Sequence, residues 1–308
     1  MANPATKAHS LGASFVPSSY NPSMIKKLTI FGVGLIGGSL AMALKKAKFC
    51  EQIVGCSRNE AHLKRAVELG VIDSYELQPE LAVQDADVVF LSVPMRAMES
   101  VMSQFKAGLS ENAIVTDGGS SKASVVEAAK SVFGTVPERF VPAHPIAGRE
   151  KSGVEAAFDS LYQDHKVILT PLEHTDAQAI DVVTAMWQAT GAEVAKLGVE
   201  QHDSVLAATS HLPHVVAYAL VDTLSGTKFV DEIFQFAAGG FRDLSRIASS
   251  DPTMWSDICI ENRAAILEMI EAYTGSLNRI KDMIENSDHQ QLFETFEKSK
   301  KTRDSYVN

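Results

Sequence analysis

Cysteine is scarce in this chain of 308 residues, and its three cysteines, Cys50, Cys56 and Cys259, form no C-x-x-C pair. So few thiols exclude a disulfide scaffold and a zinc site built from cysteine. The same scarcity is typical of the reducing cytoplasm, so we expect a cytoplasmic protein.

An excess of positive charge is also missing, because the formal net charge is −10. This balance argues against a nucleic acid or a membrane surface as partner. No uninterrupted apolar run approaches the roughly 18 residues of a membrane-spanning helix. Residues 1–23 are rich in Ser, Pro, Ala and Asn and lack the apolar core of a secretory signal, so we expect a disordered leader.

The most informative stretch present is residues 28–44, LTIFGVGLIGGSLAMAL, in which an apolar run precedes Gly32-x-Gly34-x-x-Gly37 and a helical pattern follows. Strand, glycine turn and helix form the context in which this motif indicates dinucleotide binding. The three glycines would allow a tight turn, close approach of a pyrophosphate and close helix packing, with Leu35 and Ile36 in the first helical turn. The alternative is a glycine-rich turn of an α/β protein that binds no nucleotide.

A second strand, residues 52–56, ends where such a site would contact the adenosine ribose, and Ser57 and Arg58 follow it. An acidic residue here would bind a free 2′-hydroxyl, whereas a hydroxyl and a guanidinium suit a 2′-phosphate, so the cofactor prediction leans from NAD towards NADP. Alternatively, Arg58 only stacks on the adenine. The apolar run 86–94 is typical of a central parallel strand and ends at further cofactor-binding candidates, Ser92, Val93 and Pro94.

Further strand patterns at 113–117, 140–144, 166–170 and 193–196 alternate with helical patterns, which predicts an α/β fold with a doubly wound, parallel, Rossmann-type sheet. From about residue 199 only helical spacing remains, at 202–224, 229–236, 256–285 and 289–300. We therefore predict a dinucleotide-binding domain over 24–198 and a helical domain over 199–308. Its long amphipathic helices could form a two-fold interface or pack only within the chain.

Ligands of such sheets bind beyond the carboxyl ends of the strands, where TDGGSSK and AHPIAGRE follow two strands of this sequence. His144 is there a candidate general base, and Ser120 could orient it or the substrate. A single histidine is more often structural than catalytic, and Ser120 could instead cap the next helix.

The helical part adds two imidazoles, His211 and His214, and two guanidiniums, Arg242 and Arg246, four positions apart. Nearby residues offer no further ligands at metal spacing, so no metal is predicted. Like charges on one helical face disfavour the helix and suggest an anionic ligand, unless Asp243 neutralises Arg246.

Together these segments resemble the prephenate/arogenate (cyclohexadienyl) dehydrogenases of tyrosine biosynthesis, from about Lys27 to the C-terminal helices. The resemblance is carried by GVGLIGGS, TDGGSSK, HPIAGREKSG, SHLPH and GGFRDLSRIASSDPTMW. It implies that His144 accepts the proton of the ring hydroxyl and that the following groups assist: Ser120 at the same hydroxyl, Arg246 at a carboxylate, His214 at the substrate with His211 supporting it, Glu150 as a gate, Trp255 from a partner subunit, and Arg242 where relatives carry Lys or Arg.

The resemblance further implies a homodimer and the oxidative decarboxylation of prephenate, arogenate or both, with hydride transfer to NAD or NADP. Tyrosine inhibition, if present, would act at the active site, and some relatives are fused to other shikimate-pathway enzymes. One rival is a β-hydroxyacid or imine-reducing dehydrogenase, although the lysine of the β-hydroxyacid type is missing from residues 198–202. Another is a nucleotide-sensing module without catalysis, which would not need His144, His214 and Arg246 together.

Overall fold

The structure is a computed structural model that describes residues 25–149 and 151–306. The predicted leader and Glu150 therefore lie outside the described residues. A six-stranded parallel sheet has the order β3-β2-β1-β4-β5-β6. Its strands are β1 (Ile25–Phe31), β2 (Cys50–Cys56), β3 (Ser74–Glu76), β4 (Val88–Leu91), β5 (Ile114–Asp117) and β6 (Phe140–Val141).

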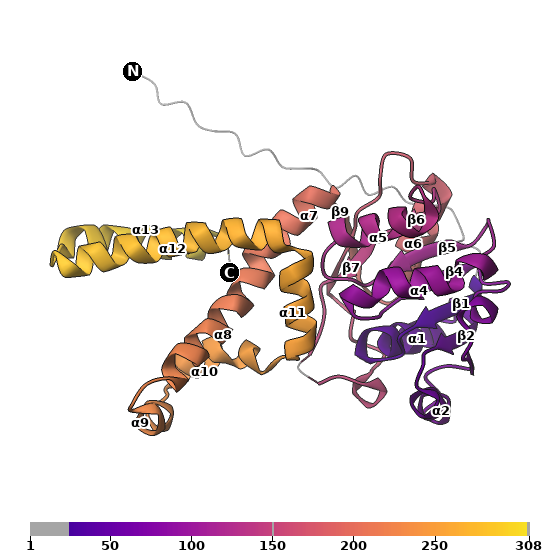
Figure 1. Ribbon diagram of the computed structural model, residues 1–308, viewed down its shortest axis with the longest axis horizontal. Helices are drawn as coiled ribbons and strands as arrows, with labels where there is room; N and C mark the ends of the chain where they lie inside the picture. The colour runs from indigo at the N-terminus through magenta and orange to yellow at the C-terminus, as the bar shows by residue number, and fades with distance from the viewer. Residues whose placement is uncertain (1–24, 150, 307–308) are drawn as a thin grey trace, which may run out of the picture.

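Helices cover both faces of this sheet, which confirms the doubly wound prediction (Figure 1). On one face, α1 (Leu35–Ala47) and α6 (Ala177–Ala189) enclose a core that includes Leu40, Phe90 and Trp187. The core of the other face includes Met102, Phe105 and Val125 from α4 (Met98–Phe105) and α5 (Ala123–Phe133). Shorter elements complete the layers: α2 (Glu60–Glu68), α3 (Pro79–Ala82), η1 (Met95–Ala97), η2 (Lys106–Gly108) and η3 (Val154–Ala156).

The strand predicted over 140–144 is wrong, because the chain changes sheets at Pro142. After β6 it enters β7 (Ala143–Pro145), which pairs antiparallel with β8 (Lys166–Leu169), and β8 pairs parallel with β9 (Glu193–Lys196). Proline has no N–H to continue a ladder, so the run is broken there. His144 consequently lies within a strand of the second sheet, opposite Ile168, and still follows the carboxyl end of β6 in the first sheet.

From residue 199 the described chain is helical, as predicted, and Figure 1 shows it as an arm beside the two sheets. The helix predicted over 256–285 is two helices, because Asn262 leaves the helical conformation between α11 and α12. The arm consists of α7 (Val199–Leu206), the π-helical turn η4 (Ala207–His211), α8 (Leu212–Ser225), α9 (Val230–Gln235), α10 (Gly239–Ser245), η5 (Arg246–Ser249), α11 (Pro252–Glu261), α12 (Arg263–Glu285) and α13 (His289–Tyr306).

Helices α7, η4 and α8 form one continuous helix, Val199–Ser225, which contains an 18-residue window with a mean hydropathy of 1.3. This helix is long and apolar enough to cross a membrane by length and composition alone, although polar residues interrupt its apolar run. Its buried side chains nevertheless include His202, Asp203 and His211, which hydrogen bond to other parts of the protein. Only 22% of its most apolar window is buried in the single chain, and most of the other residues there are half-buried.

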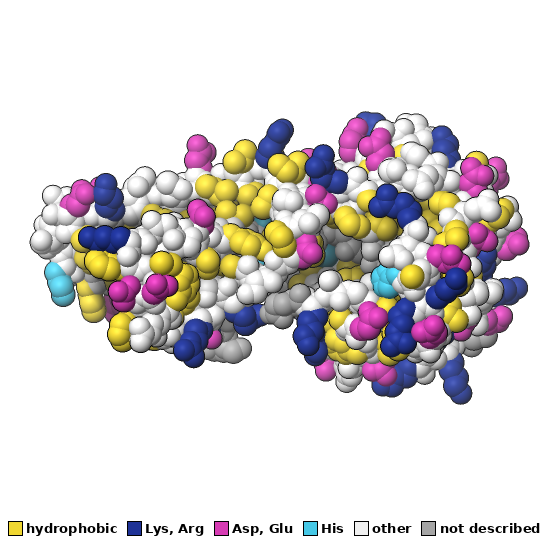
Figure 2. Space-filling view, turned by 60° about the horizontal axis from the view of Figure 1, so that its bottom comes forward, with side chains coloured by type: hydrophobic (Ala, Val, Ile, Leu, Met, Phe, Trp, Pro, Cys, Tyr) yellow, Lys and Arg dark blue, Asp and Glu magenta, His cyan; other side chains and the backbone are white. Residues whose placement is uncertain are grey.

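Exposed apolar side chains also gather on the helical arm, seen in yellow at the left of Figure 2. On α12 and α13 they include Leu267, Leu277, Ile284, Phe293 and Phe296. An isolated protein rarely exposes so many large apolar groups on one arm, so this surface has the character of an interface.

Candidate active site

The glycine motif lies at the carboxyl edge of the parallel sheet. Gly32 follows β1 with a φ of +88°, and a Cβ there would lie 2.2 Å from the carbonyl oxygen of Ser92, which follows β4. A Cβ on Gly37 would lie 2.3 Å from the carbonyl oxygen of Gly32. Only glycine allows these approaches, so the turn and the helix pack as the sequence predicted.

The first turn of α1 has room for an anion. Gly34 is the N-cap of this helix, no side chain caps it, and a Cβ on Gly34 would meet no atom within 4 Å. Open space before uncapped N–H groups at a helix N-terminus suits a pyrophosphate. In the same turn, the carbonyl of Ile36 accepts a hydrogen bond of 2.5 Å from the hydroxyl of Tyr162. The residues present therefore fit a dinucleotide.

The other cofactor candidates lie at the same edge. The Gly32 amide donates to the carbonyl of Cys56 (3.2 Å), directly before Ser57 and Arg58. The Ser57 hydroxyl accepts a bond of 3.3 Å from the Asn59 amide, and Arg58 is exposed. Ser92, whose amide donates to Phe31 (2.8 Å), begins the segment Ser92-Val93-Pro94 after β4. The structure thus brings the predicted cofactor-binding residues to one edge.

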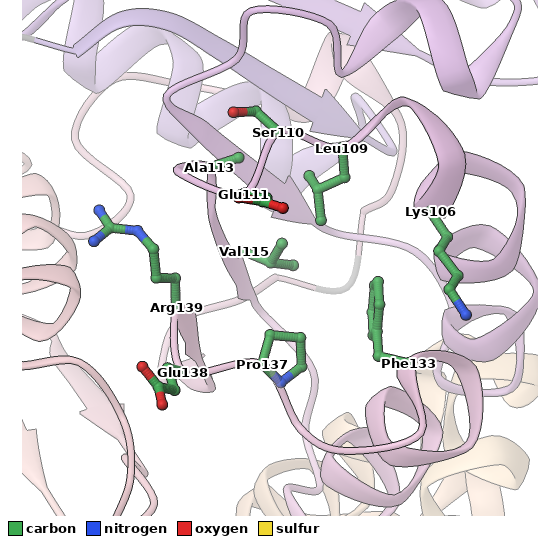
Figure 3. A pocket seen from close by; sticks show the side chains of 10 residues that line it. All are labelled: Lys106, Leu109, Ser110, Glu111, Ala113, Val115, Phe133, Pro137, Glu138 and Arg139. Atoms are coloured by element: carbon green, nitrogen blue, oxygen red, sulfur yellow. The ribbon is translucent and has the colours of Figure 1, made fainter.

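A hollow of about 460 Å³ lies at the opposite, amino end of β5 and β6 (Figure 3). Ligands of open α/β sheets bind at the carboxyl ends, so this hollow does not correspond to the nucleotide site. Its lining comprises Lys106, Leu109, Ser110, Glu111, Ala113, Val115, Phe133, Pro137, Glu138 and Arg139.

A buried ion pair fixes the backbone beside His144. Lys122 and Asp117 are both fully buried and hydrogen bonded to each other. The Lys122 ammonium also donates to the carbonyl of Ala143 (2.7 Å), and Asp117 Oδ1 accepts from the Ala143 amide (3.0 Å). Burial lowers the pKa of Lys122, against the attraction of Asp117. Both backbone groups of the residue preceding His144 are therefore held by the end of β5 and the loop after it.

His144 contacts a histidine that the sequence analysis did not single out. Its Nδ1 lies 2.9 Å from Nε2 of His202, and Nδ1 of His202 lies 2.7 Å from Oδ1 of Asp203. Burial lowers the pKa of His144 well below its ordinary value, and His202, Lys122 and His211 lower it further. Burial also lowers the pKa of His202, although the bond to Asp203 partly opposes this.

Asp203 joins the two parts of the chain. Its oxygens accept from the amides of Lys122 (2.7 Å) and Ala123 (2.9 Å) at the start of α5. Burial opposes ionisation of this carboxyl, but the bonds from His202 and from the two amides outweigh it and lower its pKa. The carboxylate of α7 therefore caps a helix of the nucleotide-binding part.

Ser120 was predicted to orient His144 or to cap the next helix. Asp203 takes the capping role, and in the described part of the chain Ser120 makes no hydrogen bond to His144. Sequence reasoning missed His202 and Asp203 because an adjacent His-Asp pair at a helix start matches no catalytic spacing. Their contact with His144 exists only through the packing of α7 on α5.

The other two predicted histidines line the same region. The side-chain amide of Asn262 donates to the carbonyl of Asp203 (2.9 Å) and lies 3.0 Å from Nδ1 of His211. Burial lowers the pKa of His211 to about 4. His214 stacks on Trp255 with ring centroids 3.6 Å apart, and His211 meets the same indole edge-on. Among the described residues, His211 Nε2 and Trp255 Nε1 are buried nitrogens with no hydrogen-bond partner.

Trp255 reaches His214 of its own chain, so this stack needs no partner subunit; a contribution of Trp255 across a dimer stays a prediction.

Arg246 lies near enough to His214 to lower its pKa, after the larger effect of burial. Arg242 and Arg246 do not share one α-helix, because α10 ends at Ser245. Both are exposed. Within the described ranges, no cluster of three potential metal ligands occurs.

Two protein-family models together match most of the chain. Residues 40–196 match the family model described as prephenate dehydrogenase, nucleotide-binding domain. Residues 198–298 match the model described as prephenate dehydrogenase, dimerization domain. The chain is 39% identical to the cyclohexadienyl dehydrogenase of Zymomonas mobilis, over 91% of this chain and 96% of that protein. It is 36% identical to the prephenate dehydrogenase of Bacillus subtilis, over 90% of this chain and 75% of that protein.

Solved structures give the same result. The prephenate dehydrogenase of Aquifex aeolicus, in complex with hydroxyphenyl propionate and NAD+, has a TM-score of 0.85 and 40% identity, covering 91% of this chain and 98% of that one. The arogenate dehydrogenase of Synechocystis has a TM-score of 0.78 and 28% identity, covering 91% and 100%. These findings exclude the rival families and do not support the lean towards NADP. The chain belongs to the prephenate/cyclohexadienyl/arogenate dehydrogenase family and is a dehydrogenase of tyrosine biosynthesis.

Proposed function

We propose that His144 is the general base of an oxidative decarboxylation in which Nε2 takes the proton of the hydroxyl on carbon 4 of a cyclohexadienyl ring. The observation that carries this assignment is the buried imidazole beside the carboxyl edge of the sheet, with a pKa lowered by burial and by His202, Lys122 and His211. A histidine with a lowered pKa is neutral at pH 7, which is the state that accepts a proton.

The substrate we propose is prephenate, its amino counterpart arogenate, or both. As hydride leaves carbon 4, His144 removes the hydroxyl proton, and loss of carbon dioxide from carbon 1 then leaves an aromatic phenolate. His144 returns the proton to the phenolate oxygen, so the imidazole is neutral again. Aromatisation drives the reaction, and the protein has to position the reacting groups and transfer one proton.

We propose NAD+ as the cofactor, held by Gly32, Gly34 and Gly37 with the first turn of α1. When bound, it supplies the hydride acceptor. The open, uncapped N-terminus at Gly34 supports a dinucleotide, and the NAD+ complex of the 40% identical Aquifex aeolicus protein favours NAD+ over NADP+. Initial rates with each cofactor test this choice, and a higher kcat/KM with NADP+ would contradict it.

Arg246, His214 and Ser120 are proposed to bind the substrate, with Arg246 gripping a carboxylate. The guanidinium fork matches two carboxylate oxygens, which an ammonium cannot do. Arg246→Lys keeps the charge and loses the fork, so KM should rise at least about tenfold while kcat changes little. An unchanged KM in this variant would reject the role. Arg242, His211, Trp255 and Glu150 keep their predicted supporting roles as proposals.

The direct test of the function is formation of NADH with prephenate and, separately, with arogenate, each with and without tyrosine. Competitive inhibition by tyrosine would agree with binding at the substrate site. His144→Asn should lower kcat about 10²–10⁴-fold with little change in KM. His165→Asn is the matched control, because His165 is exposed. If His144→Asn kept a kcat within threefold of the parent, the assignment of the base would be wrong.

We also propose that the chain acts as a homodimer, with a nucleotide-binding domain over 24–198 and a helical domain over 199–308. The match of residues 198–298 to a dimerization domain and the exposed apolar groups of α12 and α13 support this. Light scattering should give twice the chain mass of 33.3 kDa. Leu277→Glu, on the exposed surface of α12, should shift the protein towards the monomer.

A further inference from the structure

His202 and Asp203 extend inward from His144 as a continuous row of hydrogen bonds. His144 Nδ1 meets His202 Nε2 at 2.9 Å, and His202 Nδ1 meets Asp203 Oδ1 at 2.7 Å. All three residues are buried, and His202 is fully so. A neutral imidazole has one N–H and one lone pair, so the proton position on each ring follows from its partner.

The row has only one arrangement of protons that satisfies every bond. Asp203 is ionised and accepts, so His202 donates from Nδ1 and has its lone pair on Nε2. That lone pair accepts from His144, which must therefore carry its proton on Nδ1. The remaining nitrogen of His144, Nε2, is then the one with a lone pair.

We propose that His202 and Asp203 are positioning residues that hold His144 in the Nδ1–H tautomer, with its Nε2 lone pair available for the substrate hydroxyl proton. This inference rests on the proposed role of His144 and adds what sets its tautomer. In serine proteases a carboxylate fixes the tautomer of the catalytic histidine. Here the imidazole of His202 lies between the carboxylate of Asp203 and His144. The lone pair of His202 also stabilises the imidazolium that forms when His144 takes the proton.

Asp203 is unsuitable for the test because it has a second task. Its two carboxylate oxygens accept from the amides of Lys122 and Ala123, so a substitution there also removes at least one bond of a helix cap. His202 has no such task. Its two hydrogen bonds can be tested one at a time, by replacing it with asparagine or with glutamine. Asparagine places a polar atom near the Nδ1 position of histidine and glutamine places one near the Nε2 position.

The pair His202→Asn and His202→Gln therefore gives opposite predictions for the two possible roles. His202→Asn can still donate to Asp203 but does not reach His144, whereas His202→Gln offers His144 an acceptor oxygen. If His202 positions His144, His202→Asn should lower kcat at least about tenfold with KM within about twofold, and His202→Gln should stay within about threefold; the corresponding loss in serine proteases reaches about 10⁴. If His202 only holds the Asp203 carboxylate in place through its Nδ1–H, His202→Gln should be the more damaged variant.

The pH profile gives a readout that a structural role would not move. The groups facing His144 are His202, Lys122 and His211, with Asp117 and Asp203 behind them, and both variants retain the last four. Without an acceptor for Nδ1–H, the imidazolium of His144 is less stable. Both variants lack the charge of His202 that lowers the pKa of His144, and only His202→Gln offers an acceptor for Nδ1–H. The acid limb of log kcat should therefore lie at lower pH in His202→Asn than in His202→Gln.

The unaltered enzyme allows a test that does not depend on activity. Long-range ¹H–¹⁵N spectra of imidazole-labelled protein report which ring nitrogen carries the proton, and the signals lost in His144→Asn identify the His144 ring. We expect the proton on Nδ1 of His144 near pH 7.5, and a proton on Nε2 would overturn the inference. If His144→Asn remained active, the proposed function itself would fail. If it were inactive while His202→Asn matched the parent, only the role of His202 and Asp203 would fail.

Discussion

Burial of His211 should make the protein lose stability in mild acid. Its pKa falls from 6.5 to about 4 because the ring is buried, with smaller effects of Asp203, His202 and His214. Between these two values the unfolded chain binds a proton that the folded chain does not. The free energy of unfolding is therefore fully retained above pH 6.5 and decreases as the pH falls towards 4.

The size of this loss follows from the two pKa values. At pH 5 the unfolded imidazole is almost wholly protonated and the folded one is about nine-tenths neutral, which corresponds to about 2 kcal/mol from His211 alone. His144, His202 and His214 have lowered pKa values of the same sign and add to the loss in the parent protein. The contribution of His211 is thus obtained as a difference between variants.

The assay is urea unfolding at pH 7.5 and pH 5.0 at one fixed protein concentration, because a dimer's stability depends on concentration. His211→Asn keeps an oxygen near Nδ1 for the amide of Asn262 and cannot take up a proton. We expect its loss between the two pH values to be about 2 kcal/mol smaller than that of the parent. His289→Gln, on an exposed residue, is the matched control. Equal losses in His211→Asn and the parent would refute the reasoning.

Three further predictions concern the rest of the site. Gly37→Ala should weaken NAD+ binding and lower the melting temperature, since its Cβ would lie 2.3 Å from the Gly32 carbonyl; calorimetry that found both unchanged would contradict the tight packing. Lys122→Met should cost about 3–5 kcal/mol in urea unfolding, because Asp117 is left buried without its cation, and adding Asp117→Asn should recover part of this loss. Trp255→Leu should raise KM for prephenate by removing the stack on His214, whereas an increase in KM for NAD+ alone would contradict that placement.

The nucleotide-binding part could be predicted from the sequence because its signals are local. The glycine motif is read from one short strand, turn and helix, although Gly32 also packs on Ser92 of a distant strand end. Parallel strands buried on both faces appear as apolar runs. The division into two sheets was not predicted, because residues 140–144 look like one strand by their apolar pattern. The interruption comes from Pro142, which has no N–H to donate. A single proline between apolar residues does not by itself show that the chain changes sheets.

The site was predicted only in part, for a related reason. His144, His214 and Trp255 stand in recognisable motifs. The structure stacks His214 of α8 on Trp255 of α11 and places His211 near enough to His144 to lower its pKa. His202 and Asp203 act through contacts with residues some 60 to 80 positions earlier in the chain. The break at Asn262 likewise exists because its amide bonds to Asp203 and His211. Such long-range contacts leave no periodicity in the sequence.

The central claim, that a neutral His144 takes the substrate proton, is tested most directly by the pH dependence of kcat with prephenate at saturating NAD+. We expect log kcat to rise with pH through a single pKa below 6.5, the direction given by burial, and to reach a plateau by about pH 7.5. In His144→Asn the residual rate should lack this limb. An acid limb that persisted unchanged in His144→Asn would contradict the account.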